Sequence, residues 1–599
     1  MDRKSTIVLL ISFVLILSWS KLVQHYYPPV PVTIGSNGVA GATSPFGANG
    51  PTPAADNAPS ASTTISAATA PAFVAPRAAE VLEVLENENA RYTFSSHGGG
   101  LKLVELKKYR ESVANGAKQP ANSGLMTLNT QAPVPVMALL GDEASQGDGL
   151  FTLTKTATSV RAEKLLPNGL AVVKEFTLGT NYLLSVSVKL KNGETQPLAL
   201  KPQEWVIGTA TPLGPHDDAL MMGLYWYNGV KAEHIDKAWF ANTTMGCAAS
   251  VPRTEYEGGN TNIFWAAVHN QFFTIAVVPK ETAPHIVSRR IDLPPPSAQQ
   301  IAEDPKTVAK PFGFQTAFTY PAMVLAPNQQ VERQFHIFAG PKEYNTLARL
   351  GDSFGNNLDL VMDFGGFFGF FAKALLLSMN GLHALGLPYG LAIIAITVII
   401  KLAFWPLTKA STRSMKRMSA LQPQMTALKE KYKDDPKKMN LKLMEFMKEN
   451  KVSPLGGCLP MLLQIPVFFG FFTMIKSAIE LRGAQFLWAA DLSQPDTVGH
   501  LFGFPINPLP LIMGVTMLWQ ASVTPPSPGM DPAQQKIMKY MPMMFMVFLY
   551  NFSAGLTLYW TVQNLLTIAQ MKLTKTDPPA SAVAAVPVKA ASVAPKKKK

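Results

Sequence analysis

Long apolar runs divide this 599-residue chain. One run, Ser5–Val23, lies near the start, and five others lie between residues 388 and 571. As a helix, 20 residues rise roughly 30 Å, the thickness of a bilayer core. The pattern therefore predicts six membrane spans. The five later ones are Pro388–Leu407, Cys458–Leu481, Ile506–Gln520, Ile537–Phe552 and Ser553–Met571.

The first span, within residues 1–27, is interpreted as an uncleaved membrane anchor. Its Trp19 and Lys21 suit a membrane interface, whereas Ser18-Trp19-Ser20 would make a poor cleavage site. A cleaved signal peptide is the alternative. Residues 28–80 follow, rich in Pro, Ala, Gly, Ser and Thr with little charge, and are predicted to be a disordered linker.

Residues 81–345 change to alternating apolar and polar positions. Between Tyr182 and Leu190 every second residue is apolar, and the run ends at the turn signal Asn192-Gly193. Phe272–Val278 and Val331–Phe338 are similar. Recurrent strands with few helical stretches predict a β-sandwich domain.

Two helical stretches complete the pattern. Residues 346–387 are predicted to link the β domain to the spans, with Asp363–Leu385 as an amphipathic helix at the membrane interface. Residues 408–456 are charged, carry apolar positions at helical spacing, and are broken at Asp434-Asp435-Pro436, which predicts an αα-hairpin. Its apolar side chains either contact a client or partner, or pack the two helices together. They are Met425, Leu428, Met444 and Met447.

The net charge of +13 is concentrated in two segments. Residues 407–456 hold twelve Lys/Arg against five Asp/Glu, and residues 572–599 hold seven lysines against one aspartate. Basic segments beside spans usually lie in the cytoplasm. Both termini and the hairpin are therefore predicted to be cytoplasmic, with the β domain on the other side. The tail either contacts ribosomal RNA or is a solvated end.

Lys401 is the most unusual residue of the spans, because a cation inside a bilayer costs several kcal/mol unless it finds a partner or water. Thr397 lies one turn earlier on the same face, and Thr557, Thr561 and Asn564 form a polar stripe on the last span. Facing stripes predict a water-filled groove around Lys401. The alternative for Lys401 is that its side chain snorkels to the membrane interface. The alternative for the polar side chains is that they form hydrogen bonds between helices, and this interpretation is favoured for Gln520.

From Trp405 onward the chain carries seven short motifs in order over about 155 residues: Trp405–Lys409, Leu421–Pro423, Ser453–Pro460, Gln464–Pro466, Met513–Met517, Asp531–Met538 and Gly555–Tyr559. In sequence and order these motifs resemble those of the YidC-type membrane protein insertases. The resemblance implies a polytopic α-helical membrane protein of the Gram-negative inner membrane, with an N-terminal anchor, a five-helix core over 388–571 and a periplasmic β-supersandwich.

The resemblance also implies a mechanism. In this family a hydrophilic groove opens to the cytoplasm and to lipid, and an intramembrane cation attracts an acidic client segment while the client's apolar helix slides along the rim. Lys401 aligns with that cation, which is usually arginine, so the implication extends to a positive charge but not to a bidentate fork. Trp560 falls where the family often has a second tyrosine. The implied groove residues are Lys401, Thr397, Gln464, Thr557, Trp560, Thr561 and Asn564.

The implied partners are nascent integral membrane proteins, the Sec translocon, membrane lipids and, through the basic tail, the ribosome. No cofactor, metal ion or DNA is predicted. The sequence offers hooks for two other functions. Gly351–Gly355 fits G-x-S-x-G and His97–Gly100 resembles an oxyanion loop, but the residues before Ser353 are predicted to be helical, which argues against a hydrolase. A secondary transporter or channel is the stronger alternative, although no core span holds a deep carboxylate.

Overall fold

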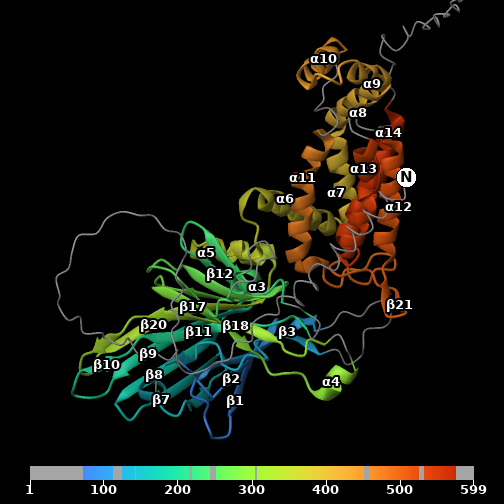
Figure 1. Cartoon of the computed structure of the whole chain (residues 1–599). Coiled ribbons are helices and arrows are strands. Elements are labelled where there is room, and N and C mark those ends of the chain that lie inside the picture. Colours follow the sequence, from blue (N-terminus) through green and yellow to red (C-terminus); the bar gives the residue numbers. More distant parts are fainter. Residues whose placement is uncertain are drawn as a thin grey trace, which may run out of the picture.

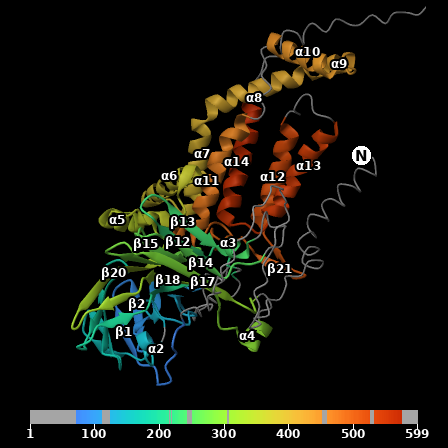
Figure 2. The same ribbon diagram turned by 60° about the vertical axis from the view of Figure 1, so that its left-hand side comes forward.

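The computed structural model describes residues 72–111, 124–141, 143–214, 217, 219–242, 251–303, 307–450, 459–524 and 532–574. The predicted anchor, the linker up to residue 71 and the tail beyond residue 574 lie outside this part. A β domain lies at one end of a helical bundle, and a small helical hairpin lies at the other end (Figures 1 and 2).

The β domain is built around a nine-stranded antiparallel sheet. The three strands that the alternating pattern predicted are confirmed as β9, β16 and β20. In spatial order the strands are β13 (Ala232–Asp236), β12 (Gly223–Tyr227), β15 (Trp265–His269), β16 (Phe273–Pro279), β20 (Gln330–Pro341), β9 (Leu183–Asn192), β8 (Leu170–Leu178), β7 (Ser159–Leu165) and β6 (Thr152–Lys155).

Two smaller sheets cover one face of this sheet and complete a sandwich, because β11 packs on β15 and β16, β1 on β7, and β4 on β16. Short helices α2 (Glu143–Gln146), α3 (Lys237–Ala241) and α4 (Ala298–Glu303) and the pair β10 (Leu198–Leu200) and β19 (Met323–Leu325) lie in connections. One of the smaller sheets has five strands, in the order β14 (Glu255–Gly258), β17 (His285–Asp292), β18 (Phe312–Tyr320), β11 (Gln203–Ala210) and β5 (Leu139–Leu140). The other has four strands, in the order β1 (Leu82–Glu86), β2 (Ala90–Ser95), β3 (Gly100–Arg110) and β4 (Leu125–Leu128).

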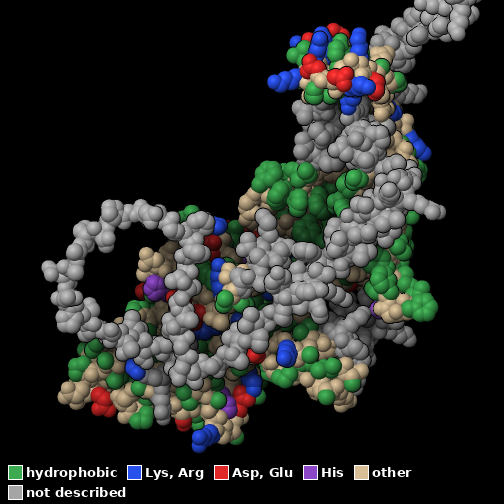
Figure 3. Space-filling view, viewed as in Figure 1, with side chains coloured by type: hydrophobic (Ala, Val, Ile, Leu, Met, Phe, Trp, Pro, Cys, Tyr) green, Lys and Arg blue, Asp and Glu red, His purple; other side chains and the backbone are tan. Residues whose placement is uncertain are grey.

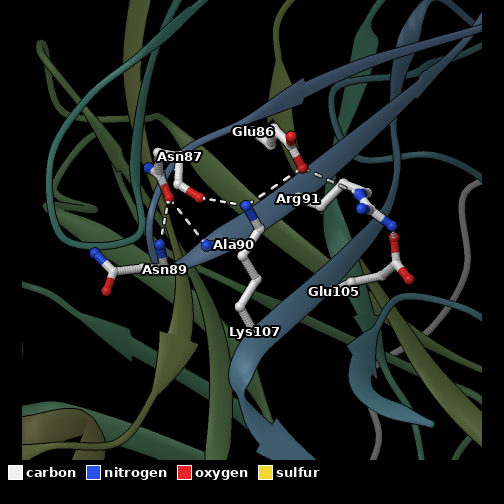
Figure 4. A network of polar contacts seen from close by, with 7 residues as sticks. All are labelled: Glu86, Asn87, Asn89, Ala90, Arg91, Glu105 and Lys107. Atoms are coloured by element: carbon white, nitrogen blue, oxygen red, sulfur yellow. Dashed lines mark hydrogen bonds and ion pairs between the residues drawn. The ribbon is translucent and has the colours of Figure 1, made fainter.

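The turn between β1 and β2 is held by side-chain contacts (Figure 4). Asn87 Oδ1 accepts from the backbone N–H groups of Asn89 and Ala90, each at 2.9 Å, and so closes the turn. Lys107 Nζ of β3 donates to the carbonyl of Asn87 at 2.7 Å and also pairs with Glu86 at 3.3 Å. The Lys107–Glu86 ion pair is partly exposed to solvent and contributes little to stability, so the turn depends mainly on the hydrogen bonds of Asn87.

Lys174 of β8 lies wholly inside the sandwich. Its Nζ donates to the carbonyl oxygens of Gly98, at 2.6 Å, and Met137, at 2.8 Å, and lies 4.4 Å from the centre of the Phe151 ring. A neutral amine has two N–H bonds, which match these two acceptors. Burial lowers the pKa of Lys174 to about 7.

This buried lysine predicts a pH dependence. Because the pKa of Lys174 is lower in the folded than in the unfolded chain, the unfolded chain binds more protons between about pH 7 and pH 10. The free energy of unfolding should therefore rise with pH across this window and fall again as pH returns to 7. Denaturant midpoints at pH 7 and pH 9.5 should show the rise, and Lys174→Met should reduce it. An equal reduction by Lys191→Met, an exposed lysine near the end of β9, would contradict this origin.

The chain leaves the sandwich through α5 (Tyr344–Phe354) and the 3₁₀ turn η1 (Leu358–Met362) and enters α6 (Gly366–Ala384), within the predicted amphipathic segment. Arg482, which follows the bundle helix α11 (Leu459–Ser477), contacts the β domain. One guanidinium nitrogen donates to the carbonyl oxygens of Arg110, at 2.7 Å, and Glu111, at 3.0 Å. The end of β3 is thereby fastened to the bundle.

The prediction of one continuous span over Pro388–Leu407 is wrong at its end. α7 (Tyr389–Ala403) stops at Phe404, and α8 (Trp405–Ala420) leaves at 64° to it. Pro406, in the first turn of α8, has no N–H to continue the hydrogen bonds of α7. By length and composition, α7 and α8 could cross a membrane only as this bent pair, and no single helix of the described part passes that test alone.

The remaining spans correspond to four helices near the predicted positions: α11, α12 (Pro508–Val523), α13 (Pro532–Phe548) and α14 (Ala554–Leu573). Another 3₁₀ turn, η3 (Ile479–Leu481), follows α11. Beyond α8 the predicted break at Asp434-Asp435-Pro436 is confirmed. α9 (Gln422–Lys431) ends before it, and α10 (Pro436–Glu449) begins after Asp435, whose side chain accepts from the N–H of Lys438.

Candidate functional site

α14 is the central helix of the bundle, packed between α7 and α12 and also touching α11. Its first turn is closed by the loop after η3. The N–H groups of Ala554 and Gly555 donate to the carbonyl oxygens of Gln494, at 2.7 Å, and Leu492, at 2.8 Å. These bonds satisfy helix-end donors and seat the loop across the β-domain end of the bundle.

Lys401 of α7 lies near the opposite end and is only 8% exposed. Its Nζ donates to Thr567 Oγ1 of α14 at 2.8 Å. Among the described residues no carboxylate forms an ion pair with it, and α7, α11, α12, α13 and α14 contain no Asp or Glu. A largely buried cation thus has a neutral hydroxyl as its side-chain partner, an arrangement that favours an external anion.

The threonines near Lys401 use their hydroxyl protons within their own helices. Thr397 donates to the carbonyl of Ile393 at 2.7 Å, Thr557 to that of Ala554 at 3.1 Å, and Thr561 to that of Thr557 at 2.7 Å. All three side chains are buried. Their oxygens keep lone pairs that can accept from water or from a client.

Asn564 behaves differently from these threonines. Its Nδ2 donates to Thr516 Oγ1 of α12 at 3.1 Å, so it joins two helices. Gln520, also on α12, was expected to do the same, but its Oε1 is buried without a hydrogen-bond partner among the described residues. That oxygen therefore does not link helices.

Gln464 and Trp560 lie on the α11 side of the site. Gln464 shares a side-chain hydrogen bond with Tyr559, whose ring stacks on Phe471 at 4.2 Å between centroids. The Trp560 ring lies 4.7 Å from Phe468 of α11 and 6.0 Å from Phe545 of α13. It therefore bridges two helices that are otherwise little in contact. Figure 3 shows a hollow lined by hydrophobic side chains on the face of the bundle beside α6 and α11.

Three polar contacts were not predicted from the sequence. Thr567, the partner of Lys401, lies three residues after Asn564 and could have been found by extending the polar stripe. Gln570 donates to Thr408 Oγ1, and Lys416 of α8 donates to the carbonyls of Met571, at 2.9 Å, and Thr574, at 2.6 Å. Lys416 thereby caps the end of α14. No sequence spacing identifies these last two contacts, because they depend on the bend at Phe404.

The hairpin side chains divide between the two interpretations. Met425 is buried, and Leu428 and Met447 are partly buried, in a cluster between α8, α9 and α10. These three pack the hairpin. Met444 is 67% exposed and lies one turn from the exposed Leu441, so this pair is free to meet another molecule.

The features of the hydrolase alternative are not assembled at Ser353. This serine lies inside α5, donating to the carbonyl of Leu350 at 2.9 Å, whereas a nucleophile elbow needs a strand before the serine. The His97 ring instead contacts the carbonyl of Ala78 at 3.0 Å. Within the described ranges no three His, Cys, Asp or Glu side chains are grouped to hold a metal ion.

Comparison with known proteins identifies both parts of the chain. The YidC periplasmic domain matches residues 84–377, and the 60Kd inner membrane protein family matches residues 381–580. The membrane protein insertase YidC of Pelobacter propionicus is 33% identical over 80% of this chain and 83% of its own length. That of Citrifermentans bemidjiense is 34% identical, with 80% and 82% covered.

Solved structures are less similar. The structure described as an active YidC insertase with its first transmembrane domain resolved is 17% identical and covers 84% of this chain and 95% of its own, with a TM-score of 0.33. The family rests on the two sequence matches and on the curated relatives. This chain belongs to the YidC family, and it is a membrane protein insertase of the bacterial inner membrane.

Proposed function

We propose that this insertase uses Lys401 as the cation of a hydrophilic groove that opens to the cytoplasm and receives an acidic segment of a nascent membrane protein. One observation carries the proposal: Lys401 is largely buried, bonded to Thr567, and has no carboxylate partner among the described residues. A client carboxylate would supply the missing counter-charge at the moment of insertion.

The polar wall of the groove consists of Thr397, Thr557 and Thr561, whose oxygens keep free lone pairs. Gln464 and Asn564, which contact Tyr559 and Thr516, would add their remaining amide atoms to this wall. Water held by these groups would lower the cost of bringing a polar client segment below the membrane surface. The loop that closes the first turn of α14 supports a groove shut at its periplasmic end.

The apolar wall would guide the client's hydrophobic helix. Ile465 and Phe469 of α11 and Met543 and Val547 of α13 are exposed, and Trp560 lies between these helices. The driving force is the transfer of that helix into lipid, at about 0.8 kcal/mol for each buried methylene. The process needs no nucleotide or catalytic side chain.

In this account both termini and the hairpin lie in the cytoplasm, and the β domain lies in the periplasm. The basic charges of residues 407–456 and 572–599 support this orientation. Met444 and Leu441 would meet clients as they arrive, and the lysine tail would meet the ribosome. The chain would work alone or with the Sec translocon.

Accessibility to water tests the groove. With Cys247 and Cys458 replaced by serine, single cysteines at Thr561 and Asn564 should react with a membrane-impermeant maleimide added to the cytoplasmic face of inverted membrane vesicles. A cysteine at Ile399, an exposed and therefore lipid-facing position of α7, is the control and should react slowly. If Thr561→Cys and Asn564→Cys react no faster than Ile399→Cys, the groove is not open to cytoplasmic water.

A further inference from the structure

A small β-hairpin at the periplasmic end of the bundle has an unusual tip. Strands β21 (Gly499–Leu501) and β22 (Phe504–Ile506) pair with Leu501 opposite Phe504, so the loop is only Phe502-Gly503. Both loop residues have positive φ, +51° and +79°, as a type I′ turn requires. Asn, Asp or Gly usually occupies the first position, because a bulky side chain is strained there. A phenylalanine therefore occupies a position where another residue would suit the backbone better.

The tip carries a largely exposed apolar surface, of which the described residues cover only part, through the ring contact of Phe504 with Tyr550. Phe502 is fully exposed, and Leu501 and Phe504 are more than half exposed. Figure 3 shows hydrophobic side chains gathered at this projection, which Figures 1 and 2 place beside the periplasmic end of α12. Strain and exposure at one residue together indicate a surface kept for contact.

The surroundings of the tip indicate that the partner of this apolar surface is lipid. β22 leads through Asn507 directly into α12, and the exposed apolar side chains continue along that helix at Leu511, Ile512 and Val515. Asn507 Nδ2 donates to the carbonyl of Tyr550 at 2.8 Å, which fixes the hairpin at the helix end. No Asp, Glu, Lys or Arg occurs between Asp496 and Asp531, so no formal charge opposes entry into a bilayer.

We propose that Leu501, Phe502 and Phe504 insert among the acyl chains of the periplasmic leaflet and anchor the periplasmic end of α12 and α13. The hairpin lies beyond α12, whereas the interfacial helix α6 packs on α11. The insertase then has an interfacial anchor on either side of its bundle. The inference requires that α12 lies in the membrane, but it does not depend on the charge or the openness of the groove.

A photo-crosslinking residue tests the anchor in the full chain, reconstituted in vesicles of phosphatidylethanolamine and phosphatidylglycerol. A benzophenone side chain at position 502 should give a phospholipid adduct, detected by mass, at least tenfold above that from position 230. Val230 is the matched control, because it is also a strongly exposed apolar residue in a hairpin loop, but of the β domain. Equal adducts at the two positions, or adducts from 502 to a second protein chain in place of lipid, would overturn the proposal.

A second variant separates the side chain from the turn. Phe502→Asn places a favoured residue at the strained position, so the hairpin should fold as well or better. With benzophenone at position 504, this substitution should lower the phospholipid adduct severalfold, because the tip no longer enters the bilayer. An adduct from 504 that is unchanged by Phe502→Asn would show that Phe502 does not anchor the hairpin.

Discussion

Lys401→Glu should reduce the insertion of a short client with an acidic translocated segment by more than about tenfold. Two unit charges 4 Å apart interact by about 4 kcal/mol at an effective dielectric constant of 20, and 1.4 kcal/mol already corresponds to a factor of ten. The substitution turns attraction into repulsion at a buried position. Lys401→Arg should retain most of the activity, and Lys401→Met should lie between. The measurement is the fraction of client protected from protease in vesicles that contain each variant.

The client provides the control for this series. When its acidic residues are replaced by asparagine, the differences among the Lys401 variants should shrink, because no charge remains to be attracted. If Lys401→Glu inserted the acidic client as well as the unaltered chain does, electrostatic capture would be excluded.

Trp265→Ala should destabilise the β domain by about 3–5 kcal/mol. The Trp265 ring is fully buried in the nine-stranded sheet and stacks on Tyr227, and its Nε1 donates to the carbonyl of Asn356 at 2.8 Å. Asn356 lies between α5 and η1, on the path to the bundle. The truncation therefore removes core packing and also releases the connection to α6. Pulse proteolysis of the full chain in denaturant would measure the loss.

Trp265→Phe separates the two contributions. It keeps most of the ring packing but leaves the Asn356 carbonyl without its donor, which should cost about 1–3 kcal/mol. A loss as large as that of Trp265→Ala would mean that the hydrogen bond, and not the packing, accounts for most of the stability at this site.

Much of the fold could be predicted from local sequence patterns. Period-2 alternation located strands such as β9 and β20, because one face of each strand is buried in the sandwich. The order of the nine-stranded sheet could not be predicted, since β9 pairs with β20 across a large sequence separation. The bend at Phe404 was also missed. Pro406 signalled a break, but the apolar run continued through it.

The candidate site shows the same division. Helical spacing placed Thr397 and Lys401 on one face, and both are buried. Thr567 was missed because the polar stripe was ended at Asn564, and Lys416 because its role depends on where α8 crosses the end of α14. In the hairpin, sequence could not tell which methionines face the partner helix. That choice follows from the packing of α9 against α10, which buries Met425 and leaves Met444 exposed.

The most direct test of the cationic groove places a photo-crosslinking residue at position 401 in vesicles that receive a stalled, short membrane protein. Leu402 is the control, because it is the next residue of α7 and is exposed. The account predicts crosslinks to the nascent chain from 401 that are lost when the client's acidic residues are neutralised, and crosslinks to lipid from 402. Crosslinks to lipid alone from both positions would contradict it and would show that Lys401 only snorkels to the interface.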